Sequence, residues 1–266
     1  MNIDLLRLRA IPSLVGWVIF LKSHPLFAIT LLIKRLSYTL TRRMSGLWVG
    51  PFGFVVDSSD ILISYWGIFV ERELQDPSWI KTLQSTTAPC VIDIGANAGV
   101  FVHYLYTLRP DVEIIAVEPQ KHLAERIAKY GRERKANINS IVAACSDHEG
   151  TATLYLNYVG DLSASINRDF MQHLSSVDVP LVTVDRIAPP RKIHLLKIDA
   201  EGHDYNVLLG ATKTLKRTSH VLIEAHKGQE QITKIHNLLG SNWELLQVSA
   251  IDYLFTNKLQ SSGDLR

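Results

Sequence analysis

Cysteine is scarce in this chain of 266 residues. Its two cysteines, Cys90 and Cys145, are too few and too far apart for a disulfide framework or a paired metal-binding motif. No two of the ten histidines stand four residues apart, and no Cys-x-x-Cys pair occurs. We therefore expect no structural zinc site, no bound metal and a reducing, cytoplasmic location.

Long apolar runs are also missing. Near the N-terminus, residues 14–21 and 26–33 are apolar, but Pro25 interrupts them and each is far shorter than the ~20 residues that span a bilayer. No small-x-small cleavage site follows the first run, which argues against a secretory signal peptide. The pattern predicts two short helices rather than a membrane span.

Acidic residues are nearly absent from residues 1–43, which carry seven Lys or Arg side chains and only Asp4. This segment has a net charge of +6, which leaves about −4 for the remainder. Basic residues near aromatic ones favour contact with a membrane surface, and the apolar runs equally favour a homodimer or packing on the main domain. Peripheral attachment to the inner face of a membrane is therefore an alternative location. The acidic remainder argues against a nucleic-acid partner.

The most informative motif that is present is VIDIGANAG, residues 91–99. Its apolar run predicts a buried parallel strand, and Gly95 and Gly99 predict a tight turn into a helix that begins near Val100. A second apolar strand, residues 114–117, ends in Glu118, where a carboxylate can accept hydrogen bonds from a ribose diol. Together the two motifs indicate a site for an adenosine-containing cofactor.

The first loop lacks the G-x-G-x-x-G pattern that a dinucleotide pyrophosphate requires. Asp93 beside the loop would repel a pyrophosphate, whereas it would favour the ammonium and sulfonium groups of S-adenosylmethionine. We therefore expect S-adenosylmethionine as the cofactor. Two alternatives stay open: an NAD-dependent oxidoreductase of Rossmann type, and a non-catalytic, membrane-docked protein that binds S-adenosylmethionine.

The order of the other predicted elements is that of a doubly wound α/β sheet. Helices are expected at residues 79–84, 122–134 and 229–239, and from KIDAEGHD to about residue 216. Further strands are expected at residues 139–144, 193–198, 220–225, 244–248 and 253–256. Residues 47–56 and 61–65 are predicted to pair as a hairpin. Alternating apolar residues at 151–158 and 179–184 predict antiparallel strands of an insertion over the sheet.

A second polar cluster, KIDAEGHD at residues 197–204, follows a predicted central strand. Asp199, Glu201 and His203 are expected at the sheet edge that holds the cofactor, and His226 follows the next strand. His203 is the first candidate for the base that removes a proton from an acceptor hydroxyl, and Asp199 is the second. Other roles stay open, because Glu201 can cap a helix and either histidine can be a solvated polar residue. Two carboxylates without a third ligand do not predict a metal site.

Seven strings in order resemble the FkbM family of S-adenosylmethionine-dependent methyltransferases: VIDIGANAG, AVEP, AACSDHEGTATLY, LSASI, VTVDRI, LLKIDAEGHDYNVLLGA and VLIEAH. The resemblance covers residues 47–258, between a basic helical segment at 1–46 and a tail at 259–266. It implies a class I methyltransferase-like fold. This is a Rossmann-like, mostly parallel seven-stranded sheet with an inserted antiparallel hairpin and a helical N-terminal extension.

By position, the resemblance implies a role for each motif. Asp93, Gly95, Asn97 and Gly99 would line the methionine part of the cofactor, Glu118 would hold the ribose, and Ser146 with Asp147 would hold the adenine. Ala96 and Pro119, within the same motifs, complete the expected cofactor contacts. Family members are typically O-methyltransferases, so the implied partner is a small molecule or glycan with a free hydroxyl, on a sugar, glycolipid or other natural product. The catalytic candidates are Asp199, Glu201, His203 and His226.

Overall fold

The computed structural model describes residues 21–22, 24–41, 48–50, 53–71, 74, 76–156, 164–166, 175–225, 228–249 and 251–261. The chain divides into two compact units, residues 1–73 and residues 74–266. Among the described helices, none combines the length and the apolar character that crossing a bilayer requires. The apolar run at residues 14–20 lies outside the described residues.

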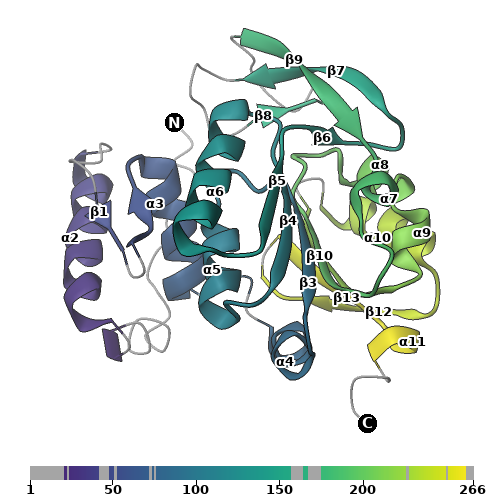
Figure 1. The fold of residues 1–266 in the computed structure, drawn as a ribbon, viewed down its shortest axis with the longest axis horizontal. Helices are drawn as coiled ribbons and strands as arrows, with labels where there is room; N and C mark the ends of the chain where they lie inside the picture. The colour runs from purple at the N-terminus through teal and green to yellow at the C-terminus, as the bar shows by residue number, and fades with distance from the viewer. Residues whose placement is uncertain are drawn as a thin grey trace. The chain divides into compact units, whose positions relative to one another are not determined.

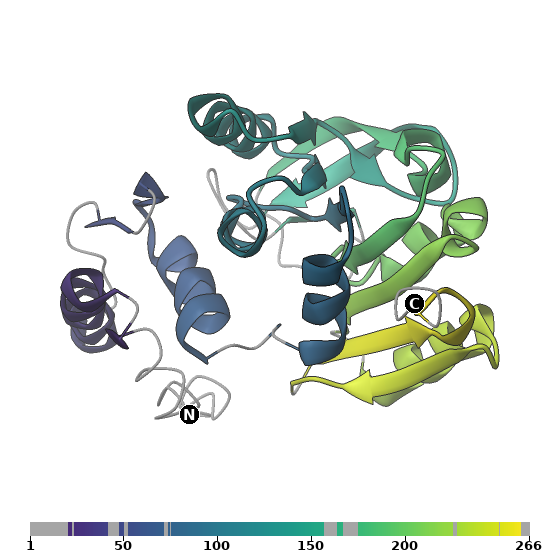
Figure 2. The same ribbon diagram turned by 60° about the horizontal axis from the view of Figure 1, so that its bottom comes forward.

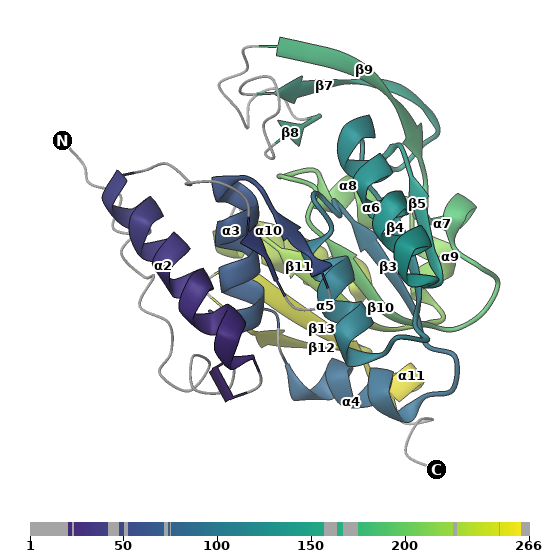
Figure 3. The same cartoon turned by 60° about the vertical axis from the view of Figure 1, so that its left-hand side comes forward.

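The described residues of the first unit form one long helix, a two-stranded sheet, a shorter helix and a π-helical turn. Its elements are α2 (Pro25–Thr41), β1 (Trp48–Val49), β2 (Val55–Val56), α3 (Ser59–Trp66) and the π-helical turn η3 (Gly67–Glu71). Helix α2 begins at Pro25. Proline suits the first position of a helix because its φ is already helical and no hydrogen bond needs its missing N–H there. The helix continues well past the apolar run that predicted it. Figure 3 shows α2 beside α3, and the two helices are in contact.

The predicted strand at residues 61–65 is wrong, because this segment is the helix α3. Ser58 caps the helix, since its side chain accepts a hydrogen bond from the Ile61 N–H. Ile61, Leu62, Tyr65 and Trp66 are buried, a spacing that places them on one face of a helix. The hairpin therefore closes earlier, where Trp48 pairs with Val56.

The second unit is built on a seven-stranded sheet, which confirms the predicted fold class. The strand order is β12-β13-β11-β10-β3-β4-β5. The five strands from β11 to β5 are parallel, and β13 and β12 are antiparallel additions at one edge. The strands are β3 (Cys90–Ile94), β4 (Glu113–Val117), β5 (Ile138–Ile141), β10 (Ile193–Ile198), β11 (Thr218–Glu224), β12 (Trp243–Gln247) and β13 (Asp252–Asn257).

Helices cover both faces of this sheet, as a parallel sheet requires. In Figures 1 and 2, α5 and α6 lie on one face, and α8 and α10 lie on the other. The helices of this unit are α4 (Pro77–Ser85), α5 (Val100–Leu108), α6 (Lys121–Arg134), α7 (Val184–Ile187), α8 (Asp204–Leu209), α9 (Thr212–Leu215), α10 (Gly228–Leu239) and α11 (Lys258–Ser261).

The helix predicted to run to residue 216 is broken into α8 and α9. The break falls at Gly210, where a Cβ would lie 2.0 Å from the carbonyl oxygen of Ser146. The missing side chain lets the two main chains touch, and this contact brings the segment after β5 against the helices.

A second, four-stranded sheet forms the insertion, in the order β6-β9-β7-β8. Its strands are β6 (Ala144–Cys145), β7 (Gly150–Leu156), β8 (Ala164–Ser165) and β9 (Ser175–Val182). The predicted antiparallel pair is confirmed as β7 and β9. The strand predicted at residues 139–144 is wrong at its end, because the chain leaves the main sheet after Ile141 and Ala144 pairs with Leu181 instead.

The topology marks one edge of the main sheet as the place for a ligand. From β3 the chain proceeds outward through β4 and β5, and it then returns to the other side of β3 as β10. The strand order therefore reverses between β3 and β10. In open α/β sheets, ligands bind at the carboxyl ends of the strands at such a switch point.

Candidate functional site

A pocket with about 580 Å³ of empty space opens at this switch point. Its walls come from the ends of β3, β4 and β10 and from the second sheet. Seventeen residues line it: Ile94, Gly95, Asn97, Val117, Glu118, Pro119, Gln120, Ala143, Ala144, Cys145, Leu154, Ala164, Ile166, Asp199, Ala200, Glu201 and His203.

Gly95 fits the floor of the pocket for two reasons. Its φ of +73° lies in the left-handed region that side chains disfavour. A Cβ at this position would also lie 1.9 Å from the backbone carbonyl oxygen of Asp199. The end of β3 and the end of β10 therefore touch main chain to main chain. This contact brings the VIDIGANAG and KIDAEGHD motifs together.

The backbone amides of the loop are already bonded within the protein. The N–H groups of Gly95 and Ala96 both donate to the Val117 carbonyl, at 3.0 and 3.1 Å, and the Gly99 N–H donates to the Ala96 carbonyl. The Asn97 N–H donates to the Glu118 carboxylate, and the Ala98 N–H donates to the Asn97 side chain. A pyrophosphate needs amides that point at it. This loop therefore suits a cofactor without a pyrophosphate.

Glu118 is the most strongly fixed acid of the pocket. It is buried, and its two oxygens accept hydrogen bonds from the N–H groups of Asn97 at 2.9 Å and Gln120 at 2.8 Å. Burial raises the pKa of this carboxyl to about 7, although the two backbone hydrogen bonds favour the ionised form. A carboxylate oxygen has two lone pairs, so each oxygen can accept one further donor. Glu118 therefore fits a diol such as that of a ribose.

A buried lysine connects two aspartates beneath the pocket. Lys197 in β10 pairs in register with Asp93 in β3, and Asp199 follows two residues later on the same side of the strand. The Lys197 Nζ lies 3.5 Å from Asp93 Oδ1 and 3.4 Å from Asp199 Oδ2. Burial disfavours the charge of Lys197, but the carboxylates of Asp93, Asp199 and Glu224 outweigh it and hold its pKa above the ordinary value. The lysine therefore stays an ammonium.

Asp93 lies behind the pocket rather than on its wall. Its side chain is fully buried and is absent from the pocket lining. Burial raises the pKa of this carboxyl, and Lys197 opposes that shift. The residue predicted to attract the sulfonium is thus held against a cation of the protein itself.

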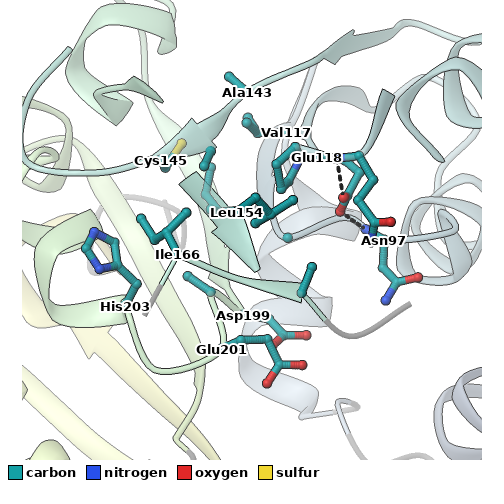
Figure 4. A pocket seen from close by; sticks show the side chains of 17 residues that line it. Asn97, Val117, Glu118, Ala143, Cys145, Leu154, Ile166, Asp199, Glu201 and His203 are labelled. Carbon is teal, nitrogen blue, oxygen red and sulfur yellow. Dashed lines mark hydrogen bonds between the residues drawn. The ribbon is translucent and has the colours of Figure 1, made fainter. Parts of the chain in front are cut away.

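The loop of residues 199–204 carries the acids at the other end of the pocket. Figure 4 shows the carboxylates of Asp199 and Glu201 pointing the same way. Glu201 has a φ of +46°, and the Ser165 hydroxyl of β8 donates to its carbonyl at 2.8 Å. Asp204 accepts from the Ala200 N–H at 2.9 Å and from the Gln231 side chain at 2.7 Å. The loop is therefore held from the second sheet and from α10.

Glu201 lies two residues before His203, which is the N-cap position of α8. It is therefore outside the first turn of that helix, where a capping acid would stand. A third acid, Glu224 at the end of β11, is close enough to interact with Asp199. The nearby Asp199 and then burial raise its pKa well above the ordinary value. Carboxylates thus crowd this end of the pocket.

His203 is turned away from the two loop carboxylates in Figure 4. Its Nε2 lies 3.0 Å from the Ser146 hydroxyl, which donates to Asp147 at 2.9 Å. Ser146 and Asp147 themselves do not line the pocket, whereas their neighbour Cys145 does. His203 thus links the pocket to the end of β6.

The structure brings seven of the predicted site residues to the lining of one pocket: Gly95, Asn97, Glu118, Pro119, Asp199, Glu201 and His203. Five predicted cofactor residues are not part of this lining: Asp93, Ala96, Gly99, Ser146 and Asp147. Among them, Gly99 faces α6, since a Cβ there would lie 2.9 Å from the Ile127 side chain. His226 lies outside the described residues.

The sequence prediction missed Lys197 and Asp204, although both stand in the KIDAEGHD motif. The signal for Lys197 was its position two residues before Asp199, which places both on one face of a strand. The apolar wall formed by Ala143, Leu154 and Ile166 had no local signal. Within the described residues, no group of three or more His, Cys, Asp or Glu side chains is arranged to hold a metal ion.

Comparison with known proteins identifies a family for most of this chain. The model of the methyltransferase FkbM domain matches residues 93–251. None of the curated proteins matches the chain. The matched residues run from the Asp93 loop to the C-terminal antiparallel strands, so they include β4, β10 and the whole pocket lining.

Several solved structures are similar in fold. Methyltransferase FkbM from Methylobacillus flagellatus KT aligns with 72% of this chain and 47% of its own, with 13% identity and a TM-score of 0.49. This chain thus spans about half the length of that protein. The N-terminal domain of human METTL16 in complex with SAH aligns with 86% of this chain and 92% of its own, at 11% identity and a TM-score of 0.42. M. capricolum TrmK in complex with S-adenosyl-homocysteine aligns over 69% of each chain, at 10% identity and a TM-score of 0.37.

Proposed function

Because this chain belongs to the FkbM methyltransferase family, we propose that it transfers a methyl group from S-adenosylmethionine to a hydroxyl oxygen of a small molecule or glycan. The family establishes an S-adenosylmethionine-dependent methyltransferase, and the predicted cofactor is confirmed. The hydroxyl acceptor is the proposal. The loop amides favour a methyltransferase over an NAD-dependent oxidoreductase. A pyrophosphate would need these N–H groups as donors, and they are already hydrogen-bonded within the protein.

The observation that carries the proposal is the separation of two kinds of acid in one pocket. Glu118 is held by backbone donors and would bind the ribose, while Gly95 keeps the floor of the pocket free of a side chain. The apolar side chains of Leu154 and Ile166 would face the adenine. The bound cofactor supplies an electrophilic methyl group. Asp199 and Glu201 then stand at the remaining end, where an acceptor would enter.

A hydroxyl group becomes a better nucleophile when a nearby base takes its proton as the new bond forms. Asp199 is the preferred base of this chain, because it lines the pocket and its carboxylate lies 3.4 Å from the Lys197 ammonium, which would orient it. Glu201 would orient the acceptor hydroxyl by accepting a second hydrogen bond. The contact of His203 with Ser146 supports a role on the adenine side of the pocket for that histidine. The crowded carboxylates also favour a neutral or cationic acceptor over an anionic one.

Transfer of a labelled methyl group tests this proposal. The full chain is incubated with S-adenosylmethionine labelled in the methyl group and with separate fractions of glycans, glycolipids, RNA and protein. We expect label in a glycan or glycolipid fraction. We expect it to survive mild alkali, because a methyl ether is stable there and a methyl ester is not.

Asp199→Asn is the matched variant for this experiment. It keeps the size of the side chain and removes the base, so we expect methyl transfer to fall about 100-fold. Its affinity for S-adenosylhomocysteine, measured by calorimetry, should stay within a few-fold of the unmodified chain. Label found only in RNA or protein, alkali-labile label, or no transfer by a chain that binds S-adenosylhomocysteine would each overturn the proposal.

A further inference from the structure

Helix α2 carries a continuous apolar stripe on its exposed side. The stripe consists of Leu26, Ile29, Ile33, Leu36 and Leu40, which follow one another at intervals of three and four residues. This spacing keeps all five side chains on one face of the helix. Their exposed fractions range from 53% for Leu36 to 84% for Leu40. Isolated exposed leucines are ordinary, but a contiguous stripe over four helical turns indicates a binding surface.

The opposite side of α2 already serves the core of its own unit. Ala28 and Leu31 are fully buried, and α2 contacts α3. The guanidinium of Arg35 lies 5.9 Å from the centre of the Trp66 ring in α3. Figure 3 shows α3 beside part of α2. The exposed stripe is therefore a second apolar face, which the packing among the described residues of this unit does not use.

The charge around this helix has one sign. The sequence contains no Asp or Glu between Asp4 and Asp57, and this interval holds seven Lys or Arg residues. Two copies that met through the stripe would bring like charges together, which disfavours association. An anionic lipid surface has the opposite charge, and each Lys or Arg near it contributes about 1 kcal/mol to binding.

We propose that the stripe of α2 docks the protein on an anionic membrane surface. The helix lies in the plane of the bilayer, with the stripe among the upper acyl chains and Lys22 and Lys34 near the headgroups. At 17 residues, α2 is about 25 Å long, less than the thickness of the hydrocarbon core. An in-plane position is therefore the one that suits its length, its charge and its two faces. This docking is independent of the methyl acceptor.

Flotation with lipid vesicles tests this docking. The full chain is mixed with vesicles of equal parts phosphatidylglycerol and phosphatidylcholine, or of phosphatidylcholine alone. We expect binding to the anionic vesicles, and about a fivefold loss for each basic contact that raised salt screens. The double variant Ile29→Gln and Ile33→Gln removes the centre of the stripe and should weaken binding at least about tenfold. The control variant Val142→Gln and Leu246→Gln removes two exposed apolar residues of the other unit and should bind as the unmodified chain does.

Light scattering and cofactor binding separate the other outcomes. Both double variants should bind S-adenosylhomocysteine normally, which shows that the chain is folded and that docking is distinct from catalysis. Absence of vesicle binding, or equal binding by both variants, overturns the proposal. The chain could instead fail to bind vesicles and form a dimer that the stripe variant lacks. That result would assign the stripe to contact with a second copy. Normal docking with no methyl transfer would overturn only the proposed function.

Discussion

Glu118 and Asp199 occupy equivalent positions, each directly after a parallel strand, yet their charges are stabilised in different ways. Two backbone N–H groups donate to Glu118, so its partners belong to the loop that the glycines shape. Asp199 faces the ammonium of Lys197, which also faces Asp93. The Glu118 end of the pocket is therefore a rigid acceptor of hydrogen bonds. The Asp199 end is one coupled network of charges, in which a change at any member affects the others.

Removal of the Lys197 ammonium, which Asp93 and Asp199 share, should cause the largest loss of stability. Lys197→Met leaves Asp93 fully buried without a counter-charge, and breaking a buried pair in this way costs about 3–5 kcal/mol of the free energy of unfolding. Urea denaturation measures this loss. Lys121→Met, at a surface lysine of α6, is the matched control and should leave stability unchanged.

The double variant Lys197→Met with Asp93→Asn sharpens the interpretation of that loss. Because the second change removes the uncompensated charge, we expect it to recover part of the stability that Lys197→Met alone loses. Equal losses for the single and double variants would show that Asp93 and Lys197 do not act as a pair. The same result would place the origin of the Lys197 effect in packing.

In Gly95→Ala, the new methyl group should push the end of β3 away from the end of β10. The new Cβ would overlap the Asp199 carbonyl, and the φ of Gly95 is positive, so we expect a loss of about 3 kcal/mol in the free energy of unfolding. Gly240→Ala has a similar φ of +85° but open space around the new Cβ. It should lose only about 1 kcal/mol, which isolates the contribution of the close approach. Thermal denaturation of both variants makes the comparison, and equal shifts would contradict it.

A smaller effect is expected from pH, and it concerns Glu118. Its pKa of about 7 in the folded chain exceeds the ordinary value of 4.5, because burial favours the neutral form. Its contribution to the free energy of unfolding therefore falls as pH rises between these two values. In the proposed mode of cofactor binding, the ribose hydroxyls donate to the ionised Glu118 carboxylate. The affinity for S-adenosylhomocysteine should therefore rise as pH increases from about 6 to about 8, by up to about tenfold.

Titration calorimetry across this pH range measures the change in affinity. Glu118→Gln should bind about tenfold more weakly at pH 8, because the charge-assisted hydrogen bonds are lost, and its affinity should vary less with pH. Glu125→Gln, an exposed acid in α6, is the control and should follow the unmodified chain. An identical pH dependence with and without the Glu118 carboxylate would assign the titration to another acid of the network.

The sequence predicted the main sheet well because its signals are local. Apolar runs mark β3, β4, β10 and β11, which are buried nearly throughout, and glycines mark the turn that follows β3. The strand predicted at residues 61–65 is wrong because a short apolar run suits a strand and a buried helix equally. The Ser58 cap and the burial of one helical face decide in favour of α3.

One motif of the family resemblance proves to stabilise the fold away from the pocket. Asp185 in VTVDRI accepts hydrogen bonds from the N–H groups of Lys213 and Thr214, at the start of α9. Backbone and side-chain hydrogen bonds hold the pKa of its carboxyl below the ordinary value, although burial acts the other way. Its place in the motif did not distinguish this anchoring role from contact with a ligand, since the partner lies 28 or 29 residues away in sequence.

By itself, the sequence determined the family, the strands of the main sheet in their order along the chain, the cofactor and the acids that follow β4 and β10. These features depend on periodicity and on residues a few positions apart. Only the tertiary structure decided which groups meet: Lys197 between Asp93 and Asp199, His203 against Ser146, and an apolar wall from the second sheet. Such contacts depend on which strands become neighbours and on the approach of distant backbones, as at Gly95, and residues a few positions apart in sequence do not specify either.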